Sequence, residues 1–517
     1  MLKYIRIALA WIFILAIMWL FLDFSGLART WFGWMAKIQL LPAVLALNIL
    51  AIAIIVGITL LVGRIYCSVI CPLGVLQDGF NWLRGRFGKK TSRKNRFKYT
   101  KPQTRVRLTL LVVFIALLMA GGIWAFAAKV IAPYSAFGRM VGSIVAPVYD
   151  WGNNLLAAES EATETYTFYR VNGVNAWSMI VAGVAVVTFI VLAVWSFIRG
   201  REYCNTVCPV GTVLGLLSRW SVFGIVIDVD KCVNCGKCGK RCKASCIDTK
   251  NHWIDNTRCV DCMDCIDNCS TGAISFTRRP AHVKVSSMQL DISKTNASLK
   301  GPRKVQPTEE SRRQFLVTGA IIAGTAAVAT AQHVTDGGLA KLDVKHDPNR
   351  KVKITPPGSQ SWDNFANHCT ACQLCINQCP NLVLSPSTEL DTLMMPSMSY
   401  VNGYCRPECN VCSTVCPTGS IKALLPEERA MVSVGLADVD YDHCLAASVG
   451  TSCGNCARHC PVDAITMVAI DPAHPHGRQR PVVNAAKCIG CGACEHLCPV
   501  APISAITVNG RARHAEL

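Results

Sequence analysis

The cysteines carry the clearest chemistry in this sequence. Four groups share the spacing C-x2-C-x2-C-x3-C, and two further groups keep the C-x2-C-x3-C-P core behind a wider first gap. Closely spaced thiolates in this pattern wrap the irons of [4Fe–4S] clusters, so the sequence predicts six clusters. The exact copies are Cys232, Cys235, Cys238, Cys242; Cys259, Cys262, Cys265, Cys269; Cys369, Cys372, Cys375, Cys379; and Cys488, Cys491, Cys494, Cys498, while the wider groups are Cys405, Cys409, Cys412, Cys416 and Cys444, Cys453, Cys456, Cys460.

The spacing also limits how these groups are used. It argues against a disulfide framework, and four identical copies argue against zinc alone. In bacterial ferredoxins the fourth cysteine of a run ligates the partner cluster, so the runs work in pairs within small α+β units. The first pair then predicts one cluster on Cys232, Cys235, Cys238 and Cys269, and another on Cys259, Cys262, Cys265 and Cys242. Spacing leaves the pairing of the four later groups open. It also leaves Cys246 as either a substitute for Cys242 or a buried spare thiol.

Four more cysteines lie in two related elements, RIYCSVICPLG from Arg64 and REYCNTVCPVG from Arg201. Each element follows a long apolar run, so the two form a parallel internal repeat. Three interpretations stay open: a helix break with buried thiols, a four-thiolate metal or cluster site shared by the copies, or redox-active thiols and a docking surface. The cysteines concerned are Cys67, Cys71, Cys204 and Cys208.

The elements that must position these groups begin with four apolar runs, at 5–22, 38–62, 108–128 and 177–198. Each is about as long as the 20 or so residues that a bilayer core requires. We therefore predict an α-helical membrane domain of four transmembrane helices, joined to α+β bacterial-ferredoxin-like [4Fe–4S] domains. The stretch 84–107 between the second and third runs holds eleven Lys and Arg and no acid. Positively charged loops stay in the cytoplasm, so both ends of this domain should face it.

A predicted export signal lies in the middle of the chain. Ser311-Arg312-Arg313-Gln314-Phe315-Leu316 opens an apolar, Ala- and Gly-rich stretch to Ala331, which resembles a twin-arginine signal. A basic linker before a buried helix is the alternative. Folded cluster domains can cross a membrane only by a route that carries folded proteins. Residues 333–517 are therefore expected in the periplasm and residues 221–310 in the cytoplasm, with 315–331 either a fifth helix or a cleaved segment.

The sequence lacks the motifs that would indicate haem, NAD(P)H or nucleic acid as cofactors or partners. The first histidine is His252, which leaves no bis-histidine haem in the apolar runs, and no C-x-x-C-H marks a c-type haem. We find no strand–GxGxxG–helix unit or Walker A loop, so NAD(P)H is not an expected partner. Much of the net charge of +19 is explained by the positively charged cytoplasmic loops, so nucleic acid is not an expected partner either.

Residues 1–280 resemble the NapH/MauN type of membrane ferredoxin, and residues 308–517 resemble the NapG/MauM type of twin-arginine polyferredoxin. The resemblance implies a fusion of two components of periplasmic nitrate reductase-type systems. Such a module would dehydrogenate quinol in a bacterial inner membrane and pass electrons to a periplasmic reductase or its cytochrome c donor. An electron-donating maturation factor for a metalloenzyme is the alternative. The internal position of the export signal departs from the family pattern.

The expected organisation is a membrane domain at 1–220, a two-cluster ferredoxin at 221–280, a linker with the export signal at 281–332 and a four-cluster polyferredoxin at 333–517. The catalytic residues for quinol oxidation stay unassigned. Candidate proton acceptors near the paired cysteine elements are Tyr66, Asp78, Glu202 and Tyr203, with interfacial anchors and solvated loop charges as the alternative.

Overall fold

The computed structural model describes residues 2–23, 25–87, 97–165, 167–170, 179–279, 335–336, 340–341, 344–389, 391–474 and 477–517. The chain divides into two compact units, Met1–Arg279 with Asp347–Leu517 and Pro280–His346. In the second unit, strands β5 (Thr335–Asp336) and β6 (Ala340–Lys341) pair antiparallel. The twin-arginine segment and the stretch 315–331 lie outside the described residues.

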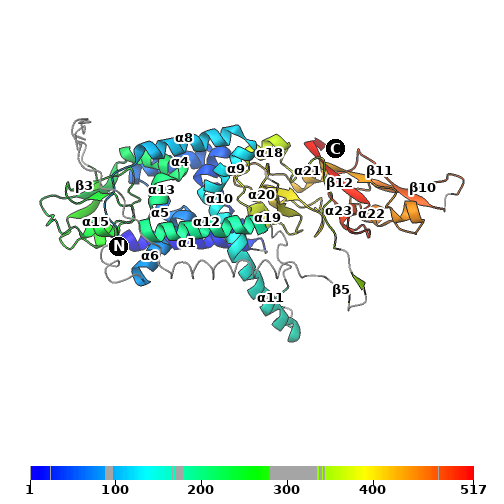
Figure 1. Cartoon of the computed structure of the whole chain (residues 1–517), viewed down its shortest axis with the longest axis horizontal. Coiled ribbons are helices and arrows are strands. Elements are labelled where there is room, and N and C mark those ends of the chain that lie inside the picture. The colour runs from blue at the N-terminus through cyan, green and yellow to red at the C-terminus, as the bar shows by residue number, and fades with distance from the viewer. Residues whose placement is uncertain are drawn as a thin grey trace, which may run out of the picture. The chain divides into compact units, whose positions relative to one another are not determined.

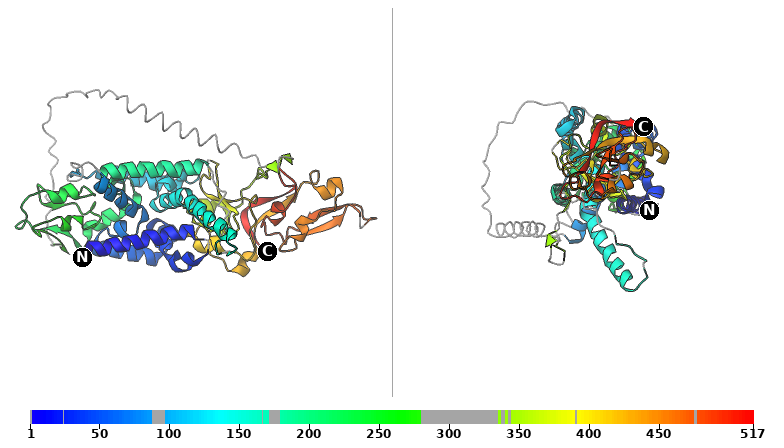
Figure 2. Two further views of the ribbon diagram at one scale, coloured as in Figure 1. Left: turned by 90° about the horizontal axis from the view of Figure 1, so that it is seen from below. Right: turned by 90° about the vertical axis from the view of Figure 1, so that its right-hand side faces the viewer.

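The first part of the larger unit is helical (Figure 1). Its elements are α1 (Leu2–Leu22), α2 (Leu27–Lys37), α3 (Leu40–Leu45), α4 (Ile49–Val62), α5 (Tyr66–Val69), α6 (Pro72–Phe87), α8 (Thr104–Ala120), α9 (Gly122–Ile131), α10 (Pro133–Met140), the π-helical turn η1 (Val141–Val145), α11 (Ala146–Ala162), α12 (Met179–Arg199), α13 (Glu202–Thr206), α14 (Pro209–Leu217) and the 3-10 turn η2 (Ser218–Trp220). Helix α11 projects away from the other helices (Figure 2).

Two of the four apolar runs form unbroken helices. Helices α1 and α12 each have 21 residues and are, within the described residues, long and apolar enough to cross a membrane. The run 38–62 is divided into α3 and α4, and the run 108–128 breaks at Gly121, whose φ of 68° suits glycine, between α8 and α9. The prediction of four transmembrane helices is therefore not confirmed by helix length.

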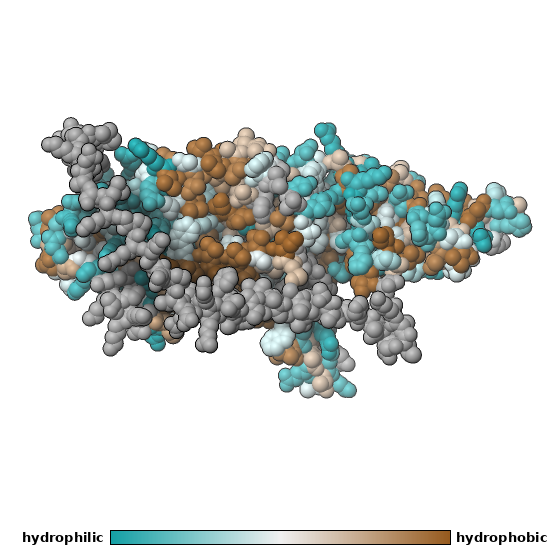
Figure 3. Space-filling model, viewed as in Figure 1, coloured by the Kyte–Doolittle hydropathy of each residue, from teal (hydrophilic) through white to brown (hydrophobic). Residues whose placement is uncertain are grey.

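Large apolar side chains nevertheless face outward on several of these helices. They include Trp11, Ile12 and Leu15 on α1, Val112, Val113 and Ile115 on α8, and Val187, Ile190, Val191 and Val194 on α12. Figure 3 shows hydrophobic residues gathered over the helical part, with hydrophilic residues prevailing on either side of it. An outward apolar surface of this extent marks an interaction with a protein or a membrane.

Short elements frame the cysteine groups of residues 221–279. They are β1 (Phe223–Ile227), α15 (Lys237–Arg241), β2 (Ile247–Asp248), β3 (Trp253–Ile254), α16 (Asp264–Asp267) and β4 (Ile274–Arg278). Strand β1 pairs antiparallel with β4, with Phe223 opposite Arg278, and β2 pairs with β3. The interior contains cysteines beside a few aliphatic residues, so apolar burial alone supplies little stability to so small a region.

The same plan recurs in the described residues after 347. The elements are α18 (Trp362–His368), α19 (Leu374–Asn377), β7 (Leu384–Pro386), β8 (Pro396–Met398), α20 (Val411–Val415), α21 (Pro426–Met431), β9 (Val432–Val439), η3 (Leu445–Val449), α22 (Asn455–Arg458), β10 (Ile465–Ala469), β11 (Gln479–Val483), α23 (Ala493–His496) and β12 (Ile506–Glu516). Antiparallel pairs form between β7 and β8, β10 and β11, and β9 and β12, the last with a register shift between Gly510 and Ala515.

The two cysteine-rich regions contact opposite ends of α1. At its start, Lys3 Nζ lies 2.9 Å from a carboxylate oxygen of Asp267. At its end, Gln378 Nε2 donates to the carbonyl oxygens of Leu20, at 2.7 Å, and Asp23, at 2.9 Å. Since a helix rises about 1.5 Å per residue, the two contacts are roughly 25 to 30 Å apart along the helix.

Candidate iron–sulfur sites

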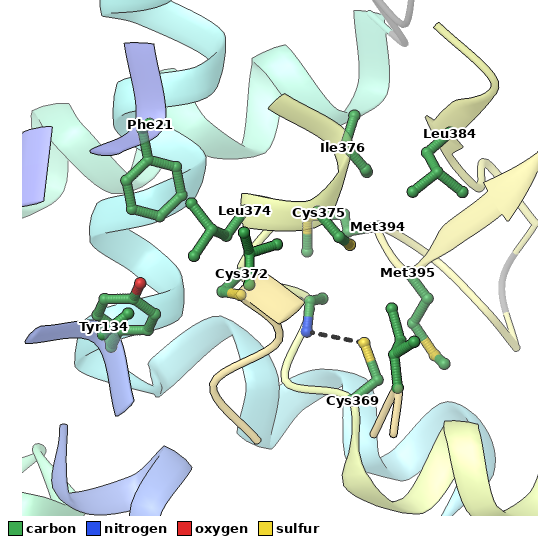
Figure 4. Packing of buried hydrophobic residues seen from close by; sticks show 14 of the residues in the cluster. Phe21, Tyr134, Cys369, Cys372, Leu374, Cys375, Ile376, Leu384, Met394 and Met395 are labelled. Atoms are coloured by element: carbon green, nitrogen blue, oxygen red, sulfur yellow. Dashed lines mark hydrogen bonds between the residues drawn. The ribbon is translucent and has the colours of Figure 1, made fainter. Parts of the chain in front are cut away.

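The four exact cysteine runs share one backbone conformation. In each, the residue before the second cysteine and the residue after it have positive φ: Asn234 and Gly236, Asp261 and Met263, Ala371 and Gln373, Gly490 and Gly492. Left-handed residues interleaved in this way turn successive backbone N–H groups towards one concave side, which binds anions. Ala371 N, for example, donates to Cys369 Sγ at 3.4 Å (Figure 4). N–H donors of this kind stabilise thiolate-bound clusters and tune their reduction potentials.

The first two runs surround two separate cavities. One is lined by Cys232, Cys235, Cys238 and Cys269. The other is lined by Cys242, Cys246, Cys259, Cys262 and Cys265. The fold thus brings together the two sets that cross-ligation predicts, three thiols from one run and the fourth from the other.

Among the four later groups, the first pairs with the second and the third pairs with the fourth. Cys379 lines a cavity with Cys405, Cys409 and Cys412, and Cys498 lines another with Cys444, Cys453 and Cys456. In the reciprocal sets, Cys416 lies in electrostatic range of Cys369, Cys372 and Cys375. Cys460 lies in range of Cys491, which is in turn in range of Cys488 and Cys494. This pairing was not accessible from spacing alone.

Each cavity suits a polynuclear group. Within the described residues, no three His, Cys, Asp or Glu side chains converge as ligands of one metal ion. A [4Fe–4S] cluster binds its four thiolates through different irons, so its ligands surround a volume rather than a point. The cysteine cavities have that form.

Cys246 lies in the second cavity as a fifth thiol. Its Sγ is 3.5 Å from Cys242 Sγ, and this hydrogen bond lowers the pKa of Cys242 to about 7. Cys246 also forms a side-chain hydrogen bond with Cys259, so it lies between two of the predicted ligands of this cavity. Burial raises the pKa of the neighbouring Asp261 to about 6.

The set around Cys372 is packed against the helical part. Phe21 of α1 and Tyr134 of α10 lie beside Cys372 and Leu374 (Figure 4). The guanidinium of Arg139, also on α10, donates to the carbonyl oxygen of Ala371 at 3.3 Å. Sequence reasoning missed Arg139, although a lone arginine shortly after the third apolar run was a usable signal.

The four candidate proton acceptors have structural partners. Tyr66 Oη donates to Gln39 Oε1 at 3.0 Å, Tyr203 Oη donates to the Ile131 carbonyl at 2.8 Å, and Glu202 accepts from Trp195 Nε1 at 2.9 Å. Both tyrosines are buried, so neither is an anchor exposed at an interface.

Asp78 is the centre of a buried charge cluster. Its carboxylate lies 3.0 Å from Arg6, 2.8 Å from Arg201 and 3.0 Å from Lys243. Burial raises the pKa of this carboxyl, but Arg201, Lys243 and Arg6 outweigh burial and hold it well below its usual value. Asp78 therefore stays ionised and is a poor base, and its role is to join α1, α6 and the first cysteine-rich region.

The cysteines of the two Arg-x-Tyr-Cys elements are all buried in the same core. The Cys71 thiol lies in electrostatic range of Cys67 and Cys204, and the Cys208 thiol lies in range of the other three. The structure therefore brings the two copies together.

Comparison with known families matches several of these regions. A model described as a 4Fe-4S binding domain matches residues 44–90 and 181–227, which contain the two Arg-x-Tyr-Cys elements. A model described as a 4Fe-4S dicluster domain matches residues 451–501. No solved structure matches the chain.

Three curated relatives illustrate the similarity. The methylamine utilization ferredoxin-type protein MauM of Paracoccus denitrificans is 32% identical over 206 residues, 38% of this chain and 83% of MauM. The ferredoxin-type protein NapG of Escherichia coli is 32% identical over 30% of this chain and 73% of NapG. The methylamine utilization ferredoxin-type protein MauN of Paracoccus denitrificans is 25% identical over 37% of this chain and 52% of MauN. The chain covers 42%, 66% and 60% of the length of three other relatives.

Proposed function

Because the chain belongs to the ferredoxin-type proteins, as a fusion of a NapH/MauN-type part with a NapG/MauM-type part, we propose that it carries electrons from membrane quinol to a periplasmic acceptor. The observation that carries this proposal is the contact of its two cysteine-rich regions with opposite ends of α1. A helix of 21 residues spans about 30 Å, the thickness of a bilayer core. One region would then lie on each side of the membrane.

The cofactors in this proposal are six [4Fe–4S] clusters, two in residues 221–279 and four after 347. When bound, these clusters supply one-electron redox chemistry. The protein supplies the ligand thiolates and the N–H donors of the left-handed turns, and it buries most of the thiols in the three sets that contain Cys262, Cys372 and Cys491. The cysteine sets described above are the proposed ligands.

The membrane domain would hold α1 and α12 across the bilayer, with the two broken runs packed beside them. The outward apolar side chains on α1, α8 and α12 would face lipid. The Lys- and Arg-rich stretch 84–107 would remain in the cytoplasm, which places residues 221–279 there and residues after 347 in the periplasm. The paired arginines Arg312 and Arg313 would mark the export route for the folded second region.

The quinol step is tested with the whole protein, purified without oxygen and reconstituted in lipid. Menaquinol or ubiquinol should reduce part of the cluster signal that dithionite reduces, as followed by electron paramagnetic resonance. If dithionite reduces the clusters and neither quinol does, the quinol role is wrong. The acceptor is tested separately, by growth of a deletion strain on periplasmic electron acceptors such as nitrate.

The two-sided arrangement is tested in intact spheroplasts. Protease added outside should cut the region after residue 347 and leave residues 221–279 intact until the membrane is opened. Protection of both regions would place them on the same side and remove the proposed direction of electron flow.

A further inference from the structure

The Arg-x-Tyr-Cys elements exchange contacts as a two-fold pair. Arg64 Nη2 of the first copy donates to the carbonyl oxygen of Cys204 at 3.2 Å, and Arg201 Nη1 of the second donates to that of Cys67 at 2.6 Å. The glycine that ends each element makes room for the same carbonyl. A Cβ on Gly74 would collide with the Cys67 oxygen. The two copies are therefore halves of one structure rather than two separate helix breaks.

The four thiols of this structure are enclosed. Each is at most 5% exposed, and together they form part of one buried core. Thiols without a role in metal binding or redox chemistry behave as small apolar groups. Apolar surroundings would suit that role, but polar and charged side chains also contact these thiols within the core.

Two arginines and an amide surround the thiols. Arg64 and Arg201 are fully buried, and Arg64 Nη2 lies 3.8 Å from Cys67 Sγ. Arg201 is paired with Asp78, whereas Arg64 forms no ion pair among the described residues, with Asp261 as a nearby carboxyl. Gln77 accepts from Cys204 Sγ at 3.4 Å, and its buried Nε2 has no hydrogen-bond partner. A nearby anion would stabilise the buried guanidinium, and it would also accept a hydrogen bond from the buried amide donor.

We propose that the four cysteines of the two elements together bind one iron–sulfur cluster inside the membrane domain. Four thiolates around such a cluster give it a net negative charge, which Arg64 would offset and to which Gln77 Nε2 could donate. The 4Fe-4S binding domain model matches this part twice, at residues 44–90 and 181–227. Each matched segment contains one pair of the proposed ligand cysteines.

The position of this site connects the other clusters. Towards the first ferredoxin region, Arg201 N donates to the carbonyl oxygen of Lys243 at 2.8 Å, and Lys243 directly follows the ligand Cys242. Towards the second, Tyr203 Oη donates to Ile131, and Arg139 joins the neighbouring carbonyl of Val130 to that of Ala371.

The site would therefore act as an intermediate electron carrier between clusters at opposite ends of α1. This part of the inference rests on the proposed function. One electron from a reduced cluster on one side would reduce the site, and the site would pass it to an oxidised cluster on the other side. Two such transfers accept the two electrons of one quinol, whose two protons leave at the quinol site.

Iron and sulfide analysis tests the cluster without any assay of quinol. Replacing one thiol in each element, Cys71→Ser with Cys208→Ser, should remove about four iron atoms and as many sulfides per chain, with the signals of the other clusters unchanged. The matched control is Ser68→Ala, because Ser68 is a buried residue of the first element, in α5, and has no thiol. Unchanged iron, or a loss of zinc in place of iron, would overturn the proposal.

A second measurement needs no variant and covers the case in which the double variant fails to fold. Seven clusters require about 28 iron atoms in the unmodified chain and six require about 24, a difference that Mössbauer and sulfide analysis can resolve. A count at the lower value refutes the additional site.

Transfer across the membrane tests the bridging role. A reductant confined to one side of a proteoliposome should reduce clusters on the other side in the Ser68→Ala control and not in the double variant. Equal transfer in the double variant would overturn the bridging role.

Discussion

The charge cluster at Asp78 leads to a quantitative prediction. Asp78→Asn keeps the size of the side chain and removes the charge that pairs with Arg6, Arg201 and Lys243. Arg201 is fully buried, and the other two cations are less than 10% exposed. Breaking a buried pair by removing one partner costs about 3 to 5 kcal/mol, because the remaining charge is left without compensation. That energy corresponds to about a hundred- to several-thousand-fold change in an equilibrium constant.

The opening of the first ferredoxin region from the helices reports this change. When opening is fast relative to cleavage, the rate of native-state proteolysis follows the open population. Cleavage within residues 221–279 should therefore accelerate about a hundredfold or more in Asp78→Asn. Asp228→Asn is the control, because Asp228 forms an exposed ion pair with Lys231 in the same region and should change nothing measurable. A cleavage rate in Asp78→Asn within twofold of the unmodified protein would refute the reasoning.

The pH dependence of the same contact has a defined sign. The folded-state pKa of Asp78 is lowered, so its contribution is complete above the unfolded value of about 3.9 and is lost only as pH falls towards the folded value. The cleavage rate of the unmodified protein should therefore show no Asp78-dependent change between pH 5 and pH 8. A loss of protection centred near pH 6 that Asp78→Asn abolishes would contradict the ionised, triply paired carboxylate.

Three further predictions concern the second region and the fifth thiol. Gln378→Ala removes both hydrogen bonds to the end of α1 and should cost about 1 to 3 kcal/mol, seen as faster proteolytic release of residues 347–517. Burial and then Arg429 lower the pKa of His514 to about 4, so thermal stability should fall as pH drops from about 6.5 towards 4, and His514→Gln should remove that dependence. Cys246→Ser should leave the iron content unchanged, whereas Cys242→Ser should lower it by about four atoms per chain; the reverse result would make Cys246 the ligand.

The cysteine groups were predictable because their geometry is local. Three ligands of each exact run lie within seven residues, and the left-handed conformations at positions such as Asn234 and Gly236 follow from the run itself. The pairing of Cys416 with the run at Cys369 was not predictable, because it depends on how separate segments fold together.

Helix boundaries and docking were less accessible for the same reason. Apolar composition gives the position of a run but not the break at Gly121. The bonds from Gln378 to the end of α1 join residues more than 350 positions apart. No local sequence pattern predicts such a contact. Only the structure shows which cysteine-rich region contacts which end of α1.

The arginine and the tyrosine of the Arg-x-Tyr-Cys frame have separate structural roles in both elements. A helix that ends inside an apolar environment exposes backbone groups that water cannot satisfy. Tyr66 Oη accepts from Leu40 N at the start of α3, and Tyr203 Oη donates to Ile131 O at the end of α9. The tyrosine of each element thus pairs with a backbone group at a helix end, while its arginine donates to the cysteine carbonyl of the other element. The Arg-x-Tyr-Cys frame therefore satisfies backbone groups both at helix ends and beside the enclosed thiols, which accounts for its recurrence in two copies.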